Sequence, residues 1–600
     1  MRQSTENHAV IGSDTGIAMV PGMTTQVFPD LRKFLDQLSD DGDVRVIEAP
    51  VDPNLEIAEI HRRVIASGGP ALLFARPKRS EIPVVTNLFG TTRRAQLAFG
   101  RRPAELVRTL VELIQEGMPP SPSRLWANRR LLGAGLRIGT RRVGRGPVTE
   151  VVSSEVDLDR LPALTSWPED GGPFITLPLV ATHHPRTGTP NLGMYRLQIH
   201  DRQTTGMHWQ IGKGGGFHYQ ASELEGRDLQ TTVFLGGPPA LILAAIAPLP
   251  ENVPELMLAS LISGGKIGQC AGPDGRPLVA DAEIALCGRV PMSLRRPEGP
   301  FGDHYGYYSL RHDYPVFQVE YTARRRDAIF PATVVGKPRQ EDFFIGDLLQ
   351  NLLSPLFPVV MPGVKSVWSY GETGYHALAG AVVRERYRRE AMASAFRILG
   401  EGQLSLTKFL LVTDRSVDLR DIRATLTHIL ARARFETDLY VFSNLSMDTL
   451  DYTGPEVNLG SKGVLLGLGE PVRDLPGEFT TSNVPTRIER VRVFCPGCLV
   501  VDGPGYAAEP DAAPRIARDP VFSDWPLVVL TDDADRATAS AINFLWTTFT
   551  RFEPAADIHP AAHRVMRHHV SYAAPIVIDA RMKPPYPCLL YTSPSPRDMI

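Results

Sequence analysis

The sequence predicts a multidomain protein of mixed α/β and α+β fold, and three observations support this. The chain has 600 residues, which is too long for a single hydrophobic core. Helical and strand-like stretches alternate near both ends of the chain, as they do in α/β domains. A central region from about residue 148 is dense in strand-like stretches separated by Gly and Pro, which is typical of a β-barrel or a β-sandwich.

Composition excludes several classes of protein. The net charge of -2 leaves no basic surface of the kind that binds nucleic acid or an anionic membrane. The polar start lacks the apolar segment of a signal peptide, and the most apolar run, PALILAAIAPLP, is too short to span a bilayer. Five cysteines in 600 residues exclude a disulfide scaffold and favour a reducing compartment. We therefore expect a cytoplasmic protein.

The first part of the chain predicts an arm followed by a small domain. Residues 1–26 are polar and without periodicity, so they predict a flexible arm. Residues 27–147 alternate between helical and strand patterns and predict an N-terminal α/β domain. Its first helix follows Phe28, with Asp30 as the expected N-cap and Gly42 just past the C-terminal end.

The rest of the chain divides into four segments. Residues 148–342 predict the central β-rich domain, with one helical insertion at VPELMLASLI. Residues 343–400 predict linker helices, because HALAGAVVRERYRREAMASAFRILG is rich in strong helix formers. Residues 401–587 return to an α/β pattern and predict a C-terminal domain with an extension. The Pro- and Ser-rich residues 588–600 predict a disordered tail.

Two local patterns lie in the C-terminal part. LLVTDRSVDLRDIRATLTHILARARFETD and LVVLTDDADRATASAINFLWTTFTRFEPAADI share a strand, a Thr-Asp turn, a helix and an Arg-Phe-Glu exit. This similarity indicates either an internal duplication or a coincidence between two βα units. Cys495 and Cys498 form a CxxC pattern, which is redox-active, half of a metal site or a tight turn that holds two thiols.

The stretch RRPEGPFGDHYGYYSL, residues 295–310, concentrates acidic residues on a backbone shaped by Gly and Pro. Glu298 and Asp303 are five residues apart and can converge on one cavity. Two carboxylates that share a cavity raise the pKa of at least one of them into the range of a general acid. The alternative is a turn whose acidic side chains cap backbone amides.

A second polar stretch, NLGMYRLQIHDRQTTGMHWQIGKGGGFHYQ, begins at Asn191. Asn191 and Arg196 flank a bend at a glycine and can face the same cavity. Lys213 and the three glycines after it offer a cation and backbone amides to a phosphate, although glycine triplets also occur at hairpin tips. His208 and His218 are candidate ligands, but a single His is more often a hydrogen-bonded structural residue.

Four motifs in these regions resemble the UbiD family of reversible decarboxylases. They are Asn-x-Gly-Met-Tyr-Arg, Thr-Thr-Gly-Met-His-Trp-Gln, Arg-Pro-Glu-Gly-Pro-Phe-Gly-Asp-His-x-Gly-Tyr-Tyr and Pro-Ala-Thr-Val-Val-Gly-Lys-Pro. The stretches GGPALLFARPK, NLFGTTRRAQLAFG and NLGSKGVLLG extend the resemblance over about residues 28–470, in family order.

The resemblance implies a lyase that uses prenylated FMN, bound in a central split β-barrel like that of flavin reductases. An Arg and two acids surround the flavin in that family, and they map onto Arg196, Glu298 and Asp303. Decarboxylation leaves electron density on a carbon atom. A modified flavin can accept this electron density, and no amino-acid side chain can. Arg196 then pairs with Glu298 and orients the substrate carboxylate, and Asp303 returns a proton after CO2 leaves.

The resemblance also implies the partners of the chain. The substrate is an α,β-unsaturated or aromatic carboxylic acid, a flavin prenyltransferase supplies the cofactor, and the chain forms a homodimer or a higher homo-oligomer. Neither nucleic acid nor a membrane is expected as a partner. The implied cofactor-binding residues are Asn191, Gly193, Met194, Tyr195, Arg196, Ile211, Lys213, Ala247, Pro248, Lys266 and Lys462.

The implied metal site departs from the family. There an Asn, a His and a Glu join a divalent metal to the flavin phosphate; Asn191 matches the Asn, but Gly212 and Lys266 replace the His and the Glu. Two missing ligands argue against bound Mn2+ or Mg2+, and against an accompanying K+. We expect the Lys266 ammonium to meet the phosphate instead, with Lys213 and Lys462 nearby. The alternatives are an alignment that slips by a residue and a site that has decayed.

Three hypotheses for the function follow. The leading one is a non-oxidative, reversible decarboxylase, because Arg196, Glu298 and Asp303 are all present. The alternative is a non-catalytic or auxiliary UbiD-like subunit of a carboxylase complex, which the missing metal ligands favour. A plain flavin-binding module would leave the Arg and the two acids unexplained.

Overall fold

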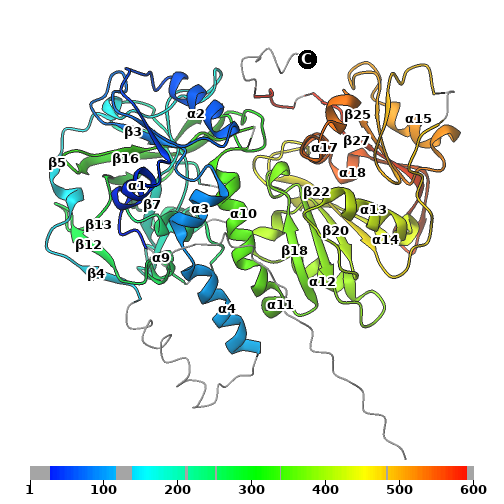
Figure 1. Cartoon of the computed structure of the whole chain (residues 1–600), viewed down its shortest axis with the longest axis horizontal. Coiled ribbons are helices and arrows are strands. Elements are labelled where there is room, and N and C mark those ends of the chain that lie inside the picture. The colour runs from blue at the N-terminus through cyan, green and yellow to red at the C-terminus, as the bar shows by residue number, and fades with distance from the viewer. Residues whose placement is uncertain are drawn as a thin grey trace, which may run out of the picture.

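The computed structural model describes residues 27–115, 138–209, 214–249, 253–337, 339–480, 484–584 and 586–590. The predicted arm, residues 1–26, lies outside these ranges, as does the predicted tail from residue 591 onward. The N-terminal and central units form one half of the molecule and two C-terminal units form the other, with helix α10 (Glu341–Leu353) between them (Figure 1). The chain is therefore a mixed α/β multidomain protein, as predicted.

The N-terminal unit is a four-stranded sheet with helices packed around it. Its strand order is β1-β2-β3-β17, and the fourth strand comes from far along the chain. The Asp30 side chain accepts the Lys33 N–H at 2.8 Å and caps the first helix, and Gly42 follows that helix with a φ of 71°, both as predicted. The elements are α1 (Leu31–Asp40), β1 (Val44–Ile47), α2 (Glu56–Ala66), β2 (Ala71–Phe74), β3 (Val84–Thr86), α3 (Thr92–Phe99), α4 (Arg102–Gln115) and β17 (Phe330–Pro331).

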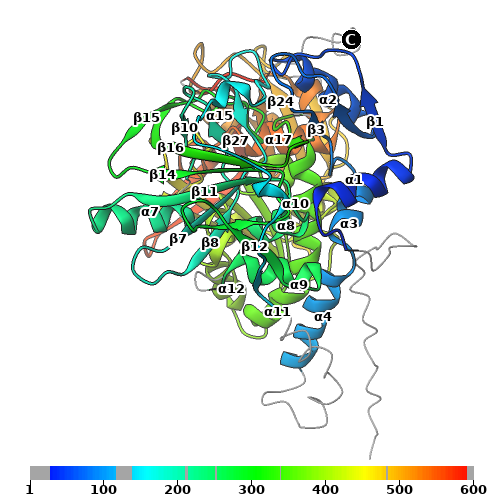
Figure 2. The same ribbon diagram turned by 90° about the vertical axis from the view of Figure 1, so that its left-hand side faces the viewer.

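The central unit is built on an eight-stranded antiparallel sheet. The strand order is β10-β16-β14-β11-β7-β8, and β5 and β15 also pair with β16. Figure 2 shows these strands following one another across the unit. Within the described residues the path ends at β8 and β10, so no closed barrel is found. The strands are β5 (Val151–Ser153), β7 (Leu179–His183), β8 (Pro190–Gly193), β10 (Thr204–Gly206), β11 (Leu229–Leu235), β14 (Ile284–Val290), β15 (Arg295–Glu298) and β16 (His312–Arg324).

Helices interrupt the central unit between β10 and β14. The insertion predicted at VPELMLASLI is helix α9 (Glu255–Ser263), and the sequence missed α7 (Gly214–Leu224) and α8 (Ala240–Ile246). The glycine triplet begins α7 and is not a hairpin tip. A Cβ atom on Gly214 would lie 2.0 Å from the Asn191 Oδ1, so a larger residue here would displace the Asn191 side chain.

The first C-terminal sheet begins earlier in the chain than the sequence indicated. The helix predicted over residues 376–400 is wrong in its first half, because Leu378–Val383 forms strand β19 and only Glu390–Leu399 forms a helix, α12. Every residue of β19 is buried. Apolar packing on both faces of this strand outweighs the helix propensity of its alanines.

One continuous helical stretch, Glu341–Val360, has the length and apolar composition of a membrane-spanning helix. It contains α10 and α11 (Phe357–Val360), and it packs against helices α3 and α4. It is the only such stretch in the described part of the chain, and by itself it is weak support for a membrane span.

The two C-terminal sheets have the same topology. The first unit has the strand order β18-β19-β20-β22-β21 and the second has β23-β24-β25-β27-β26. In both units the two outer pairs are antiparallel and the two inner pairs are parallel. The similarity in sequence is therefore an internal duplication. The strands are β18 (Val364–Ser369), β19, β20 (Phe409–Thr413), β21 (Leu439–Ser446) and β22 (Leu459–Gly467), and β23 (Val491–Cys495), β24 (Cys498–Asp502), β25 (Leu527–Thr531), β26 (Ile558–Met566) and β27 (His569–Asp579).

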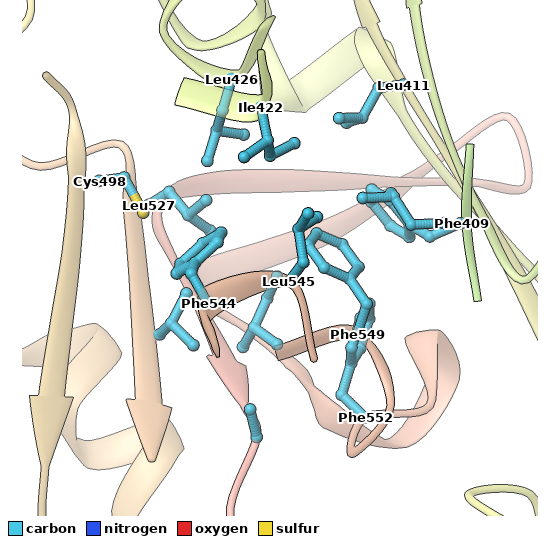
Figure 3. Packing of buried hydrophobic residues seen from close by; sticks show 14 of the residues in the cluster. Phe409, Leu411, Ile422, Leu426, Cys498, Leu527, Phe544, Leu545, Phe549 and Phe552 are labelled. Atoms are coloured by element: carbon cyan, nitrogen blue, oxygen red, sulfur yellow. The ribbon is translucent and has the colours of Figure 1, made fainter. Parts of the chain in front are cut away.

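The two C-terminal units pack against each other reciprocally. Helix α14 (Phe435–Asp438) of the first unit packs on β27, and helix α18 (Pro554–Asp557) of the second unit packs on β22. Between the sheets, α13 (Ile422–Arg432) and α17 (Ala541–Phe549) contribute to one apolar core that contains residues of both units (Figure 3). The duplication thus produces a pair with approximate twofold character inside one chain.

Phe544 tests how much this shared core contributes to stability. Its ring is fully buried and stacks on Phe494 with centroids 3.6 Å apart. Replacing Phe544 with Ala should lower the free energy of unfolding by about 4 kcal/mol, because a large buried ring leaves a cavity. Urea denaturation measures this change, and Phe217→Ala, at a ring that is 42% exposed, is the matched control. A change below about 1 kcal/mol for Phe544 would contradict the packing described.

The CxxC pattern forms the turn between β23 and β24. Cys495 and Cys498 are paired across this hairpin, and both are buried and free of disulfides. Gly497 between them has a φ of 81°. These features fit the tight-turn interpretation.

Candidate active site

The predicted acidic stretch is a loop between β15 and β16. Glu298 is the last residue of β15, and β16 begins at His312. Gly299 has a φ of 94° and donates its N–H to Gln198 Oε1 at 2.8 Å, so the chain turns directly after the first acid. We call residues 298–310 the acid loop.

Glu298 is the centre of a buried polar cluster. Its Oε1 accepts hydrogen bonds from Arg196 Nε at 3.0 Å and from His208 Nδ1 at 2.9 Å, and the residue is only 1% exposed. Burial raises the pKa of the Glu298 carboxyl, His208 and Arg196 lower it, and the net pKa lies below its usual value. Burial lowers the pKa of His208. Glu298 is therefore an ionised carboxylate between the Arg196 guanidinium and the His208 imidazole.

Arg196 contacts the acid loop at more than one point. It follows β8 and precedes β9 (Leu197–Gln198). Its guanidinium lies 4.4 Å from the centre of the Phe301 ring and donates to Ser309 Oγ at 3.4 Å, in addition to the pair with Glu298. The structure thus contains the Arg196–Glu298 ion pair that the sequence predicted, with an aromatic face supporting the cation.

Asp303 is the second acid of the loop, and it is 2% exposed. Its Oδ1 accepts the Tyr305 N–H at 2.8 Å. Burial raises the pKa of Asp303 to about 6, against the charge of His304, the Tyr305 hydrogen bond and the charge of Arg196. A carboxyl group with this pKa holds a proton for part of the time near neutral pH, as a general acid must.

The raised pKa of Asp303 predicts a dependence of stability on pH. An unfolded Asp titrates near pH 3.9 and the folded Asp303 near 6, so between these values the folded state binds more protons. The contribution of Asp303 to the free energy of unfolding should therefore fall by about 3 kcal/mol as the pH rises from about 4 to about 6. The difference between the wild type and Asp303→Asn in urea denaturation isolates this contribution. A difference that is independent of pH would contradict a raised pKa.

Asp170 is a third acid at this loop and is half-buried, and the sequence patterns did not reveal it. Its Oδ1 accepts the Gly302 N–H at 2.8 Å, and its Oδ2 accepts the N–H groups of Ser166 and Trp167, both at 2.9 Å. Burial raises its pKa to about 6. Asp170 fixes the backbone one residue before Asp303, and no local pattern links it to a loop so far along the chain.

A cavity of about 350 Å³ beside β8 brings together predicted cofactor contacts from two segments. It is lined by Asn191, Gly193 and Tyr195 from around β8, and by Ala247 and Pro248 from the end of α8. The Gly215 N–H donates to the Tyr195 hydroxyl at 3.2 Å and joins the start of α7 to this wall. Met194, between two lining residues, packs into an apolar cluster instead.

Glu255 lines the same cavity and was also missed from the sequence. It is the first residue of α9, and its Oε2 accepts the Leu192 N–H at 2.8 Å, while burial raises its pKa. The cavity therefore has a carboxylate beside Asn191, although the sequence predicted none. Lys266, which was expected at the phosphate, is exposed just before β12 (Ile267–Ala271) and does not line the cavity. Its contact with a phosphate stays a prediction.

The remaining predicted contacts lie outside the described residues or in the C-terminal half. Ile211, Gly212 and Lys213 fall in a range that the structure does not describe. Lys462 is buried in the first C-terminal unit and donates to the Thr407 carbonyl oxygen at 3.0 Å, and burial lowers its pKa to about 8. Among the described residues no group of three or more His, Cys, Asp or Glu is placed to hold a metal ion.

Four buried polar atoms of residues named above, or next to them in the chain, have no hydrogen-bond partner within the described protein. They are Asn191 Nδ2, Glu298 Oε2, His208 Nε2 and Trp209 Nε1. Buried polar atoms are normally paired, so these four are available to a bound group. An ion pair, unpaired donors and acceptors, and an adjoining cavity with Asn191 and Tyr195 fit a flavin nucleotide with its substrate.

Comparison with known proteins identifies the family of the chain. The chain matches the 3-octaprenyl-4-hydroxybenzoate carboxy-lyase N-terminal domain over residues 35–114, the Rift-related domain over residues 141–338 and the C-terminal domain over residues 343–467, all of UbiD. An uncharacterized protein of Chlamydia trachomatis is 50% identical over 560 residues, which are 93% of this chain and 96% of the relative. A Chlamydia pneumoniae protein, named as one subunit of a 4-hydroxybenzoate decarboxylase, is 49% identical over 92% of this chain and 94% of its own.

Solved structures show the same fold. The UbiD-class enzyme HmfF from Pelotomaculum thermopropionicum, in complex with FMN, has a TM-score of 0.61 at 24% identity and covers 76% of this chain and 97% of its own. The closed form of vanillic acid decarboxylase from Sedimentibacter hydroxybenzoicus has a TM-score of 0.65 at 22% identity and covers 77% of this chain and 96% of its own.

Proposed function

The chain belongs to the UbiD family, and we propose that it is a prenylated-FMN-dependent carboxy-lyase that reversibly decarboxylates an aromatic carboxylic acid. One observation carries the proposal. Arg196 and an ionised Glu298 form a buried pair, and Asp303 on the same loop has a pKa raised to about 6. A fixed cation, a fixed carboxylate and a carboxyl group that holds a proton are the groups that decarboxylation and reprotonation need.

Arg196 is the proposed anchor for the substrate carboxylate. A guanidinium has five N–H donors, and two of those on Arg196 are used for Glu298 and Ser309. The others are available to a carboxylate, which a guanidinium binds with two parallel hydrogen bonds. Glu298 holds the guanidinium in place and cannot itself take a proton easily, because its pKa is lowered.

Asp303 is the proposed proton donor. After CO2 departs, its carboxyl O–H gives the proton to the carbon that lost the carboxylate, and in the reverse direction its carboxylate accepts that proton. The burial that raises its pKa also keeps water from competing for the proton. A prenylated flavin, when bound, supplies the electron sink for this chemistry.

The cavity beside β8 is the proposed site for the phosphate end of the cofactor. Asn191 and Tyr195 offer polar groups there, and Gly193 and Gly214 allow a close approach of the backbone. Asn191 and Glu255 together could also hold a divalent metal, whereas the Lys266 ammonium would take the place of such a metal. Elemental analysis of the active protein distinguishes these two alternatives, because stoichiometric Mn2+ or Mg2+ would exclude the role of Lys266.

The choice of an aromatic acid rests on the names of relatives. One relative is named for 4-hydroxybenzoate and one structural neighbour for vanillic acid. The wider class of α,β-unsaturated acids remains within the proposal. We further propose a central split β-barrel, a homo-oligomer, a cytoplasmic location and a flavin prenyltransferase as the supplier of the cofactor.

The experiment compares protein produced with and without a flavin prenyltransferase. We expect a bound modified flavin by absorbance and mass spectrometry only when the prenyltransferase is present. That protein should release CO2 from 4-hydroxybenzoate or a related aromatic acid. If modified flavin and activity are absent in both preparations, the leading proposal fails.

An auxiliary role is the second candidate. The relative from Chlamydia pneumoniae is named as a subunit, which suggests an assembly of several proteins. In that case the chain alone would bind the flavin without turnover, and activity would appear only after the other proteins of the assembly were added.

A further inference from the structure

The second C-terminal unit reaches directly to the acid loop. Trp546 of α17 donates its Nε1–H to the Tyr305 carbonyl oxygen at 2.7 Å, and its ring stacks on Tyr307 with centroids 5.4 Å apart. The Tyr307 hydroxyl lies 3.0 Å from Thr550 Oγ1 and accepts a hydrogen bond from Arg551 Nε at 3.1 Å. All five residues are buried. Two tyrosines of the loop are thus bonded to the second unit.

The same two tyrosines hold Asp303. Asp303 Oδ1 accepts the Tyr305 N–H at 2.8 Å, and the Asp303 N–H donates to the Tyr307 carbonyl oxygen at 3.1 Å. The Gly306 N–H donates to the Asp303 carbonyl oxygen at 3.0 Å and closes a tight turn. Any movement of Tyr305 or Tyr307 therefore moves the Asp303 carboxyl.

The chain that follows the second sheet adds backbone contacts to this turn. The Tyr308 N–H donates to the Cys588 carbonyl oxygen at 2.9 Å, and the Leu590 N–H donates to the Gly306 carbonyl oxygen at 3.1 Å. The turn is therefore bonded to residues both within and after the second unit.

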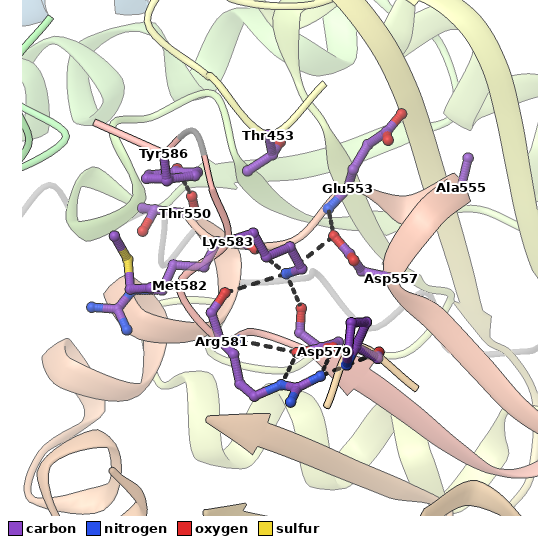
Figure 4. A network of polar contacts seen from close by, with 12 residues as sticks. Thr453, Thr550, Glu553, Ala555, Asp557, Asp579, Arg581, Met582, Lys583 and Tyr586 are labelled. Atoms are coloured by element: carbon purple, nitrogen blue, oxygen red, sulfur yellow. Dashed lines mark hydrogen bonds and ion pairs between the residues drawn. The ribbon is translucent and has the colours of Figure 1, made fainter. Parts of the chain in front are cut away.

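A polar network makes this part of the second unit rigid (Figure 4). Lys583 Nζ donates to the carbonyl oxygens of Arg551 at 2.9 Å and Asp579 at 2.7 Å, and it lies 3.4 Å from an oxygen of Asp557. Arg581 pairs with Asp579 at 2.6 Å, and both side chains are buried. Because the polar groups of this network bond to one another, the part of the second unit that contacts the acid loop is itself held in place.

From these contacts we infer that the second C-terminal unit positions the proton donor of the active site, with Trp546 and Arg551 as positioning residues for Asp303. The inference rests on the proposed function, because it concerns the role of Asp303 in it. The family match ends at residue 467, so this role belongs to the duplicated unit that follows. The second C-terminal unit packs against the first unit, and in this position it also contacts the acid loop.

The test uses the full chain with Trp546→Phe, which keeps an aromatic ring and removes the N–H donor. The matched control is Trp525→Phe, because Trp525 is buried in a different apolar cluster of the same unit. The first measurement is amide hydrogen exchange of the peptide that contains residues 303–308, which needs no cofactor. We expect exchange at least about tenfold faster in Trp546→Phe and unchanged exchange in the control.

The second measurement is kinetic, on protein loaded with prenylated flavin. A displaced proton donor should lower kcat about tenfold, while KM for the aromatic acid stays the same because Arg196 still binds it. Tyr307→Phe, which breaks the contacts with Thr550 and Arg551, should have the same two effects. This second variant provides the result if Trp546→Phe does not fold.

The outcomes separate this inference from the proposed function. Faster exchange together with a lower kcat supports the positioning role. Unchanged exchange at 303–308, or faster exchange with an unchanged kcat, overturns it. If the wild type loaded with prenylated flavin has no decarboxylase activity, the proposed function fails. The role of Trp546 in positioning a proton donor then fails too, even if hydrogen exchange shows that Trp546 holds the acid loop.

Discussion

Replacing Asp303 with Asn is expected to lower kcat about 1000-fold while the protein still binds its flavin. Asn keeps the size of the side chain and can still accept the Tyr305 N–H, but it has no acidic proton to give. A positioned general acid contributes on the order of 100- to 10000-fold to a rate, so the loss should be large. Steady-state CO2 release measures kcat, and the absorbance of the bound flavin measures occupancy.

Asp313→Asn is the matched control for this variant. Asp313 lies at the start of β16, close in sequence to the acid loop, but it is exposed. Its substitution should leave both kcat and flavin binding unchanged. Full activity of Asp303→Asn would remove Asp303 from the role of proton donor.

Replacing Arg196 with Met should have the second large effect, on both stability and activity. The Glu298 side chain is 0% exposed and would keep only His208 of its two charge-assisted partners. Removing one partner of a buried ion pair costs about 3 kcal/mol or more, because the other charge is left uncompensated. Urea denaturation should show this loss, and CO2 release should be abolished because the anchor for the substrate carboxylate is gone.

The double variant Arg196→Met with Glu298→Gln separates the charge effect from the loss of packing. If the buried charge causes the instability, removing the Glu298 charge should restore most of the lost free energy of unfolding without restoring activity. A double variant as unstable as Arg196→Met alone would show instead that the contacts of Arg196 with Phe301 and Ser309 dominate.

Local patterns predicted those parts of the fold that depend on neighbouring residues. The Asp30 cap and Gly42 were predicted because a helix end is decided within a few residues. The strand Leu378–Val383 was mistaken for a helix, because alanine-rich apolar stretches suit both states and only burial in the sheet decides between them.

The duplicated unit shows a similar limit. Two similar stretches of sequence indicated a repeat, but coincidence was an equal alternative until both sheets showed one topology. That the repeat packs against its original and against the acid loop involves contacts between residues far apart in the chain. The hydrophobic periodicity of a sequence does not predict contacts of this kind.

The sequence by itself determined the family and predicted Arg196, Glu298 and Asp303 as the site residues, because motifs depend on residue types at fixed spacing. The tertiary structure alone decided which groups surround them. His208 and Asp170 join the acids, and Glu255 faces the cavity of Asn191, through contacts that cross between elements. The physical reason is that burial and charge set the pKa of Asp303, and both arise from residues that meet only when the chain is folded.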